Sequence, residues 1–168
     1  EVRPGAYGGF VLAKGLSIFG TAPGVSFGDV TVQNVGGGPR VQLARWSCRK
    51  LSVLDCARVV VLDELAIVNI ETLQVIPAYG ARVERCADVR MLRVTISSVA
   101  VTRYDDEILP ALSVRDARVE LVRCSLTGQS GDVGGQLSSV DDLPAMPGSA
   151  ALYLGPNAIA HVSLSQLQ

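Results

Sequence analysis

Part of this chain repeats itself thirty residues further on. Residues 81–96 read Ala-Arg-Val-Glu-Arg-Cys-Ala-Asp-Val-Arg-Met-Leu-Arg-Val-Thr-Ile, and residues 111–126 read Ala-Leu-Ser-Val-Arg-Asp-Ala-Arg-Val-Glu-Leu-Val-Arg-Cys-Ser-Leu. The identical pairs are Ala81/Ala111, Arg85/Arg115, Ala87/Ala117, Val89/Val119 and Arg93/Arg123. A less similar third copy runs from Ala151 to Leu164. Self-similarity built from short apolar segments is typical of a solenoid, and it restricts the folds open to the chain.

Short apolar segments separated by turn residues cover nearly the whole chain. Apolar residues alternate at period two, as at Val89/Met91 and Val119/Leu121, and no segment predicts a helix of three turns. Abundant Val favours strands, and the 17 Gly and 8 Pro supply turns. The predicted strands are Gly9–Leu12, Leu16–Phe19, Val30–Val35, Val41–Ala44, Leu51–Leu54, Val59–Leu62, Ala66–Ile70, Leu73–Ile76, Ala81–Glu84, Val89–Leu92, Val94–Ile96, Val99–Thr102, Ala111–Val114, Val119–Val122, Ala151–Leu154 and Ile159–Leu164.

The spacing of these strands distinguishes between all-β folds. Strands begin near residues 41, 59 and 81, a separation that suits one three-strand rung at roughly 3.3 Å per residue. The next equivalents begin at 111 and 151, and two insertions at one corner, Ser97–Pro110 and Thr127–Ser149, account for the excess. A β-sandwich would use hairpin turns such as Asn-Gly or Asp-Gly, which the sequence lacks. The spacing therefore favours a β-solenoid, with an irregular sandwich or barrel as the alternative.

The N-terminal residues carry a family resemblance. The sequence Arg3-Pro4-Gly5-Ala6-Tyr7 is followed by Gly15-Leu16-Ser17-Ile18-Phe19-Gly20. Pro-Gly makes a corner, and the two later glycines permit tight bends. This pattern resembles the opening rungs of right-handed parallel β-helix proteins of the pectate lyase-like class, which includes pectin methylesterases. Together with the repeat, the resemblance covers nearly the whole chain and implies an all-β, right-handed single-stranded parallel β-helix with two loop insertions.

The length of 168 residues suits a single domain. Proteins of this class usually place a capping segment before the first rung, whereas here a strand should already be under way near Glu1. An uncapped end exposes apolar core and unpaired strand edges. We therefore expect residues 1–168 to be one β-helix domain and a fragment of a larger protein, with upstream sequence removed or another chain covering this end.

Composition excludes several classes of function. The net charge is −1, without a basic stripe or aromatic platforms, which argues against nucleic acid as a partner. No apolar run is long enough to span a membrane. Because Phe, Trp and Tyr are few, the core should consist of Val, Leu, Ile and Ala. Arg82, Arg85, Arg90 and Arg93 alternate with apolar residues, as expected on the solvent face of strands.

The cysteines do not form a metal-binding motif. Cys48, Cys56, Cys86 and Cys124 contain no Cys-x-x-Cys pair, and His161 cannot complete a zinc site with them at a usual spacing. Cys among apolar strand residues behaves as a small hydrophobe, which favours buried free thiols. A disulfide is the alternative, and Cys48–Cys56 is the nearest pair in sequence. His161 itself is expected on a strand face.

The two insertions hold the candidate binding residues, because ligand grooves in this class are walled by corner loops. Paired carboxylates can perform acid/base chemistry on glycosides or hold Ca²⁺ through several oxygens, and Arg and Tyr can hydrogen-bond to and stack on a sugar. These residues are equally at home as solvated loop residues, and no obligatory cofactor is predicted. The candidates are Arg103, Tyr104, Asp105, Asp106, Glu107, Asp132, Asp141 and Asp142.

The catalytic motifs of the class do not transfer. Polygalacturonase-like proteins combine Asp-Asp with Gly-His-Gly and Arg-x-Lys, and only the Asp-Asp pairs occur here. We therefore predict a non-catalytic β-helix domain of a secreted or surface protein with a structural or carbohydrate-binding role and polysaccharide as its partner. The alternatives are a small polysaccharide lyase or hydrolase that uses Asp105/Asp106 and Asp141/Asp142, and an assembly module that stacks end to end through its open rungs.

Overall fold

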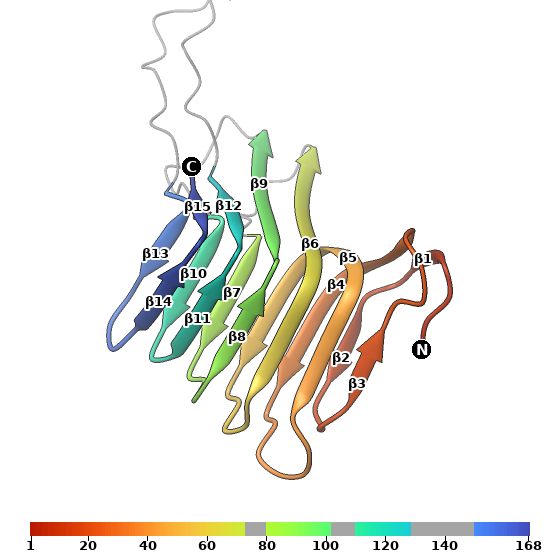
Figure 1. Ribbon diagram of the computed structural model, residues 1–168, viewed down its shortest axis with the longest axis horizontal. Helices are drawn as coiled ribbons and strands as arrows, with labels where there is room; N and C mark the ends of the chain where they lie inside the picture. Colours follow the sequence, from red (N-terminus) through yellow and green to blue (C-terminus); the bar gives the residue numbers. More distant parts are fainter. Residues whose placement is uncertain (73–79, 102–109, 129–149) are drawn as a thin grey trace, which may run out of the picture.

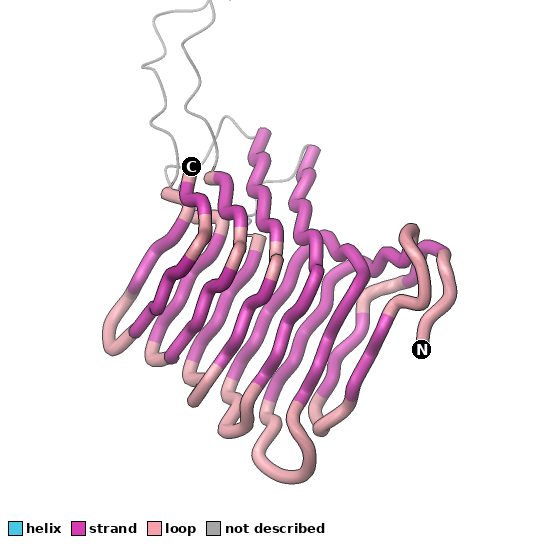
Figure 2. The backbone as a smooth tube through the Cα atoms, in the orientation of Figure 1, coloured by secondary structure: helices cyan, strands magenta, loops and turns pink. Residues whose placement is uncertain are grey.

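The computed structural model describes residues 1–72, 80–101, 110–128 and 150–168. Within these ranges the protein is all-β, with fifteen strands that pair only in parallel and without a helix (Figure 2). It follows that no helix in this part of the chain has the length and apolarity to cross a lipid bilayer. The prediction of an all-β chain is confirmed.

The strands are β1 (Gly5–Tyr7), β2 (Phe10–Leu12), β3 (Ser17–Phe19), β4 (Val25–Gln33), β5 (Val41–Leu54), β6 (Val60–Thr72), β7 (Ala81–Glu84), β8 (Val89–Leu92), β9 (Thr95–Val101), β10 (Leu112–Arg115), β11 (Arg118–Val122), β12 (Ser125–Thr127), β13 (Leu152–Leu154), β14 (Ile159–Ser163) and β15 (Gln166–Leu167). Sequence patterning missed β1, the first half of β4, β12 and β15. It also divided β5 in two, because exposed polar residues interrupt its apolar alternation. The predicted strand Leu73–Ile76 lies outside the described residues.

The parallel pairings arrange these strands in three columns (Figure 1). Column A stacks β1, the first part of β4, the middle of β5, the second part of β6, β9, β12 and β15. Column B stacks β2, the end of β4, the end of β5, β7, β10 and β13. Column C stacks β3, the starts of β5 and β6, β8, β11 and β14. The chain visits the columns in the order B, C, A, and we call each such passage a repeat.

The repeats differ in length because one connection grows. In column B the register partners are Phe10, Val30, Leu51, Ala81, Leu112 and Leu152, so successive repeats advance by 20, 21, 30, 31 and 40 residues. The three long repeats all lengthen the connection from column A to column B, after β6, β9 and β12. The two predicted insertions are therefore at the same corner, as expected. The prediction misses a third insertion, between β6 and β7. It treats the strands that begin near residues 59 and 81 as equivalent, but Val60 pairs with Val89 in column C, whereas Ala81 pairs with Leu51 in column B.

The internal alignment is correct in two columns and wrong in the third. Val89 pairs with Val119 and Thr95 with Ser125, at the predicted offset of thirty residues. In column B, however, Ala81 pairs with Leu112, at an offset of thirty-one. The pairs Ala81/Ala111 and Arg85/Arg115 are thus one residue out of register. A slip of one residue moves every side chain of a strand to the opposite face, so the ungapped alignment would have placed Val83 beside Ser113 instead of Val114.

Single residues in the left-handed conformation turn the chain between columns. All are exposed, their φ angles lie between 47° and 64°, and none is glycine. Non-glycine residues seldom adopt this conformation, so its recurrence at equivalent positions marks a corner that the fold imposes. The B–C corner comprises Asn34, Asp55, Arg85, Asp116 and Asn157, and the C–A corner comprises Arg45, Glu64, Arg93, Arg123 and Leu164.

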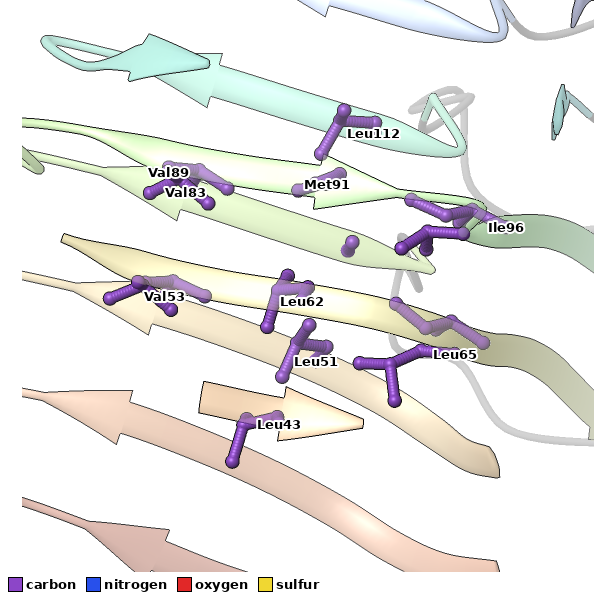
Figure 3. Close-up of a cluster of buried hydrophobic side chains, with 14 of the residues drawn as sticks. Leu43, Leu51, Val53, Leu62, Leu65, Val83, Val89, Met91, Ile96 and Leu112 are labelled. Carbon is purple, nitrogen blue, oxygen red and sulfur yellow. The ribbon is translucent and has the colours of Figure 1, made fainter. Parts of the chain in front are cut away.

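Inward-facing side chains from all three columns form one continuous core (Figure 3). Leu43, Leu62, Met91 and Leu121 are successive register partners in column C, and all are fully buried. The predicted aliphatic core is confirmed in the middle of the stack. Near the N-terminal end, aromatic residues pack beside it: Phe27 lies 5.1 Å from both Phe10 and Trp46, and Tyr7 lies 5.4 Å from Phe27, measured between ring centroids.

Glycines bring neighbouring repeats into close contact near the N-terminus. A Cβ atom on Gly15 would lie 2.0 Å from the carbonyl oxygen of Pro39, and one on Gly20 would lie 2.1 Å from that of Arg45. Neither glycine has a positive φ angle. The sequence therefore marks the right positions for glycine, but the reason is close backbone approach between repeats and not a tight bend.

Candidate functional site

The predicted binding residues lie outside the described part of the chain. Arg103, Tyr104, Asp105, Asp106 and Glu107 fall within 102–109, and Asp132, Asp141 and Asp142 fall within 129–149. The described strands on either side show that both segments connect column A to column B. Convergence of the two acidic pairs remains a prediction.

A groove of about 620 Å³ lies beside the C–A corner, on the outer side of column A. Its size is within the range of small-molecule sites in proteins. One wall is the loop that precedes β4, and the floor is formed by three successive repeats. The lining residues are Gly20, Thr21, Ala22, Pro23, Gly24, Val25, Arg45, Trp46, Ser47, Glu64, Leu65, Ala66, Arg93 and Thr95.

Charged side chains of the C–A corner form a continuous row along the groove. Arg45 Nε lies 3.3 Å from one carboxylate oxygen of Glu64, and Arg93 Nε lies 3.2 Å from the other. Arg93 also donates hydrogen bonds of 2.7 and 2.9 Å to both oxygens of Asp63. Two cations thus balance two carboxylates, and the row is electrically neutral. The left-handed backbone at Arg45, Glu64 and Arg93 directs these side chains outward at matching positions of adjacent repeats.

Small residues form the floor of the groove. Ser47, Ala66 and Thr95 are register partners in column A, and they alternate with the inward-facing Trp46 and Leu65. The Ser47 hydroxyl donates a hydrogen bond of 3.3 Å to the carbonyl oxygen of Val25. Because these three outward-facing side chains are small, they leave room for a ligand above the floor.

Trp46 supports the groove from the core side. Its ring is almost completely buried against Phe27, and its Nε1 is the only buried side-chain polar atom without a hydrogen-bond partner in the described part of the protein. An unpaired buried donor destabilises the folded state. The aromatic contacts with Phe27 and Phe10 offset this cost by fixing the floor strand against the core.

The B–C corner carries a second group of ion pairs. Arg85 donates hydrogen bonds of 2.5 and 2.9 Å to Asp55 in the preceding repeat, and this contact holds the pKa of the Asp55 carboxyl below its usual value. Asn157 donates a hydrogen bond of 2.8 Å to Asp116. These contacts link consecutive repeats along an exposed edge. None of these four residues lines the groove, so we assign their contacts to stability and not to binding.

Sequence reasoning did not identify Arg45, Glu64 or Arg93 as site residues. It placed the arginines on solvent-facing strand surfaces, which is right for Arg90 on β8, whereas Arg85 and Arg93 are exposed at the corners between strands. The missed signal was the position of charged residues directly before an inward apolar residue, as in Arg45-Trp46, Glu64-Leu65 and Arg93-Val94. His161 lies exposed on β14, as predicted, and among the described residues no group of His, Cys, Asp and Glu could hold a metal ion.

Comparisons with protein-family models, curated proteins and solved structures give no match to this chain. The resemblance to pectate lyase-like proteins thus rests on the residues quoted above.

Proposed function

We propose that the chain is a right-handed single-stranded parallel β-helix domain of a secreted or surface protein, non-catalytic, which binds polysaccharide in the groove beside column A. The three columns, the purely parallel register and the basic repeat of about twenty residues support the β-helix. Insertions that all lie at one corner are typical of such solenoids.

The observation that carries the binding proposal is the neutral row of Arg45, Asp63, Glu64 and Arg93 above a floor of small residues, Ser47, Ala66 and Thr95. A sugar hydroxyl both donates and accepts hydrogen bonds. The row offers guanidinium donors and carboxylate acceptors at successive repeats. Because its charges balance, the row suits an uncharged chain of hydroxyl groups better than a polyanion. The direction of the groove across three repeats fits an extended polymer.

The proposal is tested by applying the 168-residue chain to an array of neutral and acidic polysaccharides and then titrating the bound ones by calorimetry. Arg93→Gln should weaken binding about tenfold or more, which corresponds to one or two lost charge-assisted hydrogen bonds. Arg90→Gln is the matched control, because Arg90 is exposed on column C and away from the groove lining. Absence of binding to every polysaccharide, or equal loss in both variants, would contradict the proposal.

A further set of titrations, with and without Ca²⁺, distinguishes binding in the groove from binding by the acidic insertions. The titrations are repeated with Ca²⁺ and with a chelator. Binding in the groove should be unaffected by the metal, because the carboxylates of the row are already paired with arginines. Binding that requires Ca²⁺ would shift the site to the insertions that hold Asp105/Asp106 and Asp141/Asp142.

A further inference from the structure

Two cysteines from successive repeats lie side by side in the core. Cys56 follows the corner residue Asp55, and Cys86 follows its equivalent Arg85. Backbone hydrogen bonds bracket the pair: Asp55 N donates to Glu84 O at 3.0 Å, and Ala87 N donates to Cys56 O at 2.9 Å. The two cysteines are therefore register partners on adjacent parallel strand ends. The sequence-based alternative of a Cys48–Cys56 disulfide pairs the wrong residues, because Cys48 lies in column A, where its partners are Phe27 and Ile67.

The spacing of neighbouring strands suits a disulfide. Adjacent strands lie roughly 4.8 Å apart, within the separation of about 4.4–6.8 Å that a disulfide requires between Cα atoms. Both side chains point into the core, with exposed fractions of 0% and 3%, and each thiol donates a hydrogen bond to a carbonyl oxygen two residues earlier, Cys56 to Leu54 at 3.3 Å and Cys86 to Glu84 at 3.1 Å. The backbone need not move far to join the two sulfur atoms.

The pair is isolated from other ligating groups. The equivalent positions in the flanking repeats are Val35 and Ala117, which are buried and apolar. No third Cys or His among the described residues joins the pair to form a metal site. Disulfide formation is thus the chemistry open to these two thiols.

The pair is buried but shallow. The residues on both sides of Cys56, Asp55 and Ala57, are exposed, and so are Arg85 and Ala87 on both sides of Cys86. Both cysteines therefore lie directly beside the exposed turn of the B–C corner. Local opening of this corner, which lies outside the strand ladders, would admit a molecule as small as a peroxide.

We propose that Cys56 and Cys86 form an oxidation-sensitive pair that closes to a disulfide and joins adjacent repeats. With hydrogen peroxide as oxidant, the Cys56 thiolate attacks one peroxide oxygen, the O–O bond breaks, and a sulfenic acid and hydroxide form. The Cys86 thiol then attacks the sulfenic sulfur, the S–O bond breaks, and water leaves. In total, two thiols are oxidised to one disulfide and one peroxide is reduced to two waters.

The pKa shifts of the two thiols indicate which cysteine attacks the peroxide and which attacks the sulfenic acid. The neighbouring Cys86 thiol lowers the pKa of Cys56 to about 7, and the proximity of Cys56, together with burial, raises the pKa of Cys86. By contrast, burial raises the pKa of Cys48 to about 12. Cys56 is therefore the more readily ionised of the two thiols, and the thiolate is the form that reacts with peroxide.

Peptide mapping tests the proposal directly. The folded 168-residue chain is treated with peroxide, alkylated and digested with trypsin without reductant. Cleavage after Lys50, Arg58, Arg85 and Arg90 places the two cysteines in the separate peptides 51–58 and 86–90. We expect these peptides to appear as one linked mass that reductant separates. Cys86→Ala, which copies Ala117 of the next repeat, should abolish the link, whereas a Cys48→Ala/Cys124→Ala double variant should retain it.

A second experiment does not require peroxide to reach the buried thiols. The chain is refolded in a mixture of oxidised and reduced glutathione, so that the disulfide can form by thiol exchange before the core closes. The oxidised protein should unfold at a temperature roughly 5–15 °C higher than the reduced one, and Cys86→Ala should lose this difference. Failure to find the 51–58/86–90 link by both routes, or a link through Cys48 or Cys124, would overturn the proposal.

Discussion

At the scale of single residues, Glu84 is the one charged side chain buried within the described structure, with 5% of its surface exposed. It accepts a hydrogen bond of 2.5 Å from Arg82 and lies 3.4 Å from Arg85. The hydrogen bond from Arg82 is the main reason that the pKa of Glu84 is lowered, and it outweighs the burial that acts in the opposite direction. Breaking a buried pair leaves the remaining charges without compensation, so this carboxylate should contribute to stability.

Glu84→Gln should therefore lower the free energy of unfolding at pH 7 by about 1–3 kcal/mol. Because the folded-state pKa is lowered, the contribution of Glu84 is present above the unfolded pKa and is lost as pH falls through the folded one. The difference between parent and variant should thus shrink in acid. Urea unfolding at pH 7 and at pH 3 measures both values. Glu120→Gln is the control, since Glu120 is 46% exposed and lies 3.8 Å from Arg90, and it should cost less than about 1 kcal/mol.

At the scale of elements, the corners balance backbone strain against side-chain contacts. Arg93 and Arg123 occupy equivalent positions of the C–A corner, both with a φ angle of 54°. Arg93 contacts Asp63 and Glu64, whereas Arg123 has no side-chain partner among the described residues. The two positions thus share one strained backbone conformation and differ in what offsets the strain.

Glycine substitution separates the cost of the backbone strain from the benefit of the side-chain contacts. Arg123→Gly should raise the free energy of unfolding by about 0.5–1 kcal/mol, because glycine adopts a positive φ without steric cost. Arg93→Gly should not stabilise, because the loss of its contacts with Asp63 and Glu64 cancels or exceeds the relieved strain. Chemical denaturation of both variants and the parent gives the comparison. Equal stabilisation at both positions would show that the Arg93 contacts contribute nothing.

Alternation at period two predicted most of the strands and the aliphatic core, because inward positions must be apolar wherever repeats stack. The corner residues could not be predicted in the same way. Asn34 and Asp55 tolerate the left-handed conformation, but Arg45 and Leu164 carry no local preference for it, and only the stacked neighbours enforce it. The sequence also does not show that the B–C corner differs in length by one residue between these two repeats. Ala81 and Ala111 look equivalent in sequence, but Ala81 pairs with Leu112. The groove and the Cys56–Cys86 pair depend on the register of β5 with β6, β6 with β9 and β5 with β7, which the alignment of residues 81–96 with 111–126 does not include.

At the scale of the whole molecule, the stack differs at its two ends (Figure 1). Aromatic rings occupy the interior at the end that contains β1–β3. The last described repeat, β13–β15, leaves Leu154, Val162 and Leu167 exposed by 46%, 43% and 47%. Their register partners in the preceding repeat are Val114, Leu121 and Leu126, which are fully buried. This face has the apolar pattern of a core position, and its strand edges pair with no further strand among the described residues, a combination that promotes association.

We therefore expect the 168-residue chain to self-associate through this face, with the strand edges of a second copy continuing the stack. Light scattering should show a mass that rises with concentration. Val162→Lys should reduce this association, because it places a charge among side chains that a following repeat would bury. Ile159→Lys is the matched control in the same strand: Ile159 is 54% exposed, but its partner Arg118 is exposed as well, so this position stays in solvent when the stack continues. A concentration-independent monomer, or equal loss of association in both variants, would exclude stacking through this end.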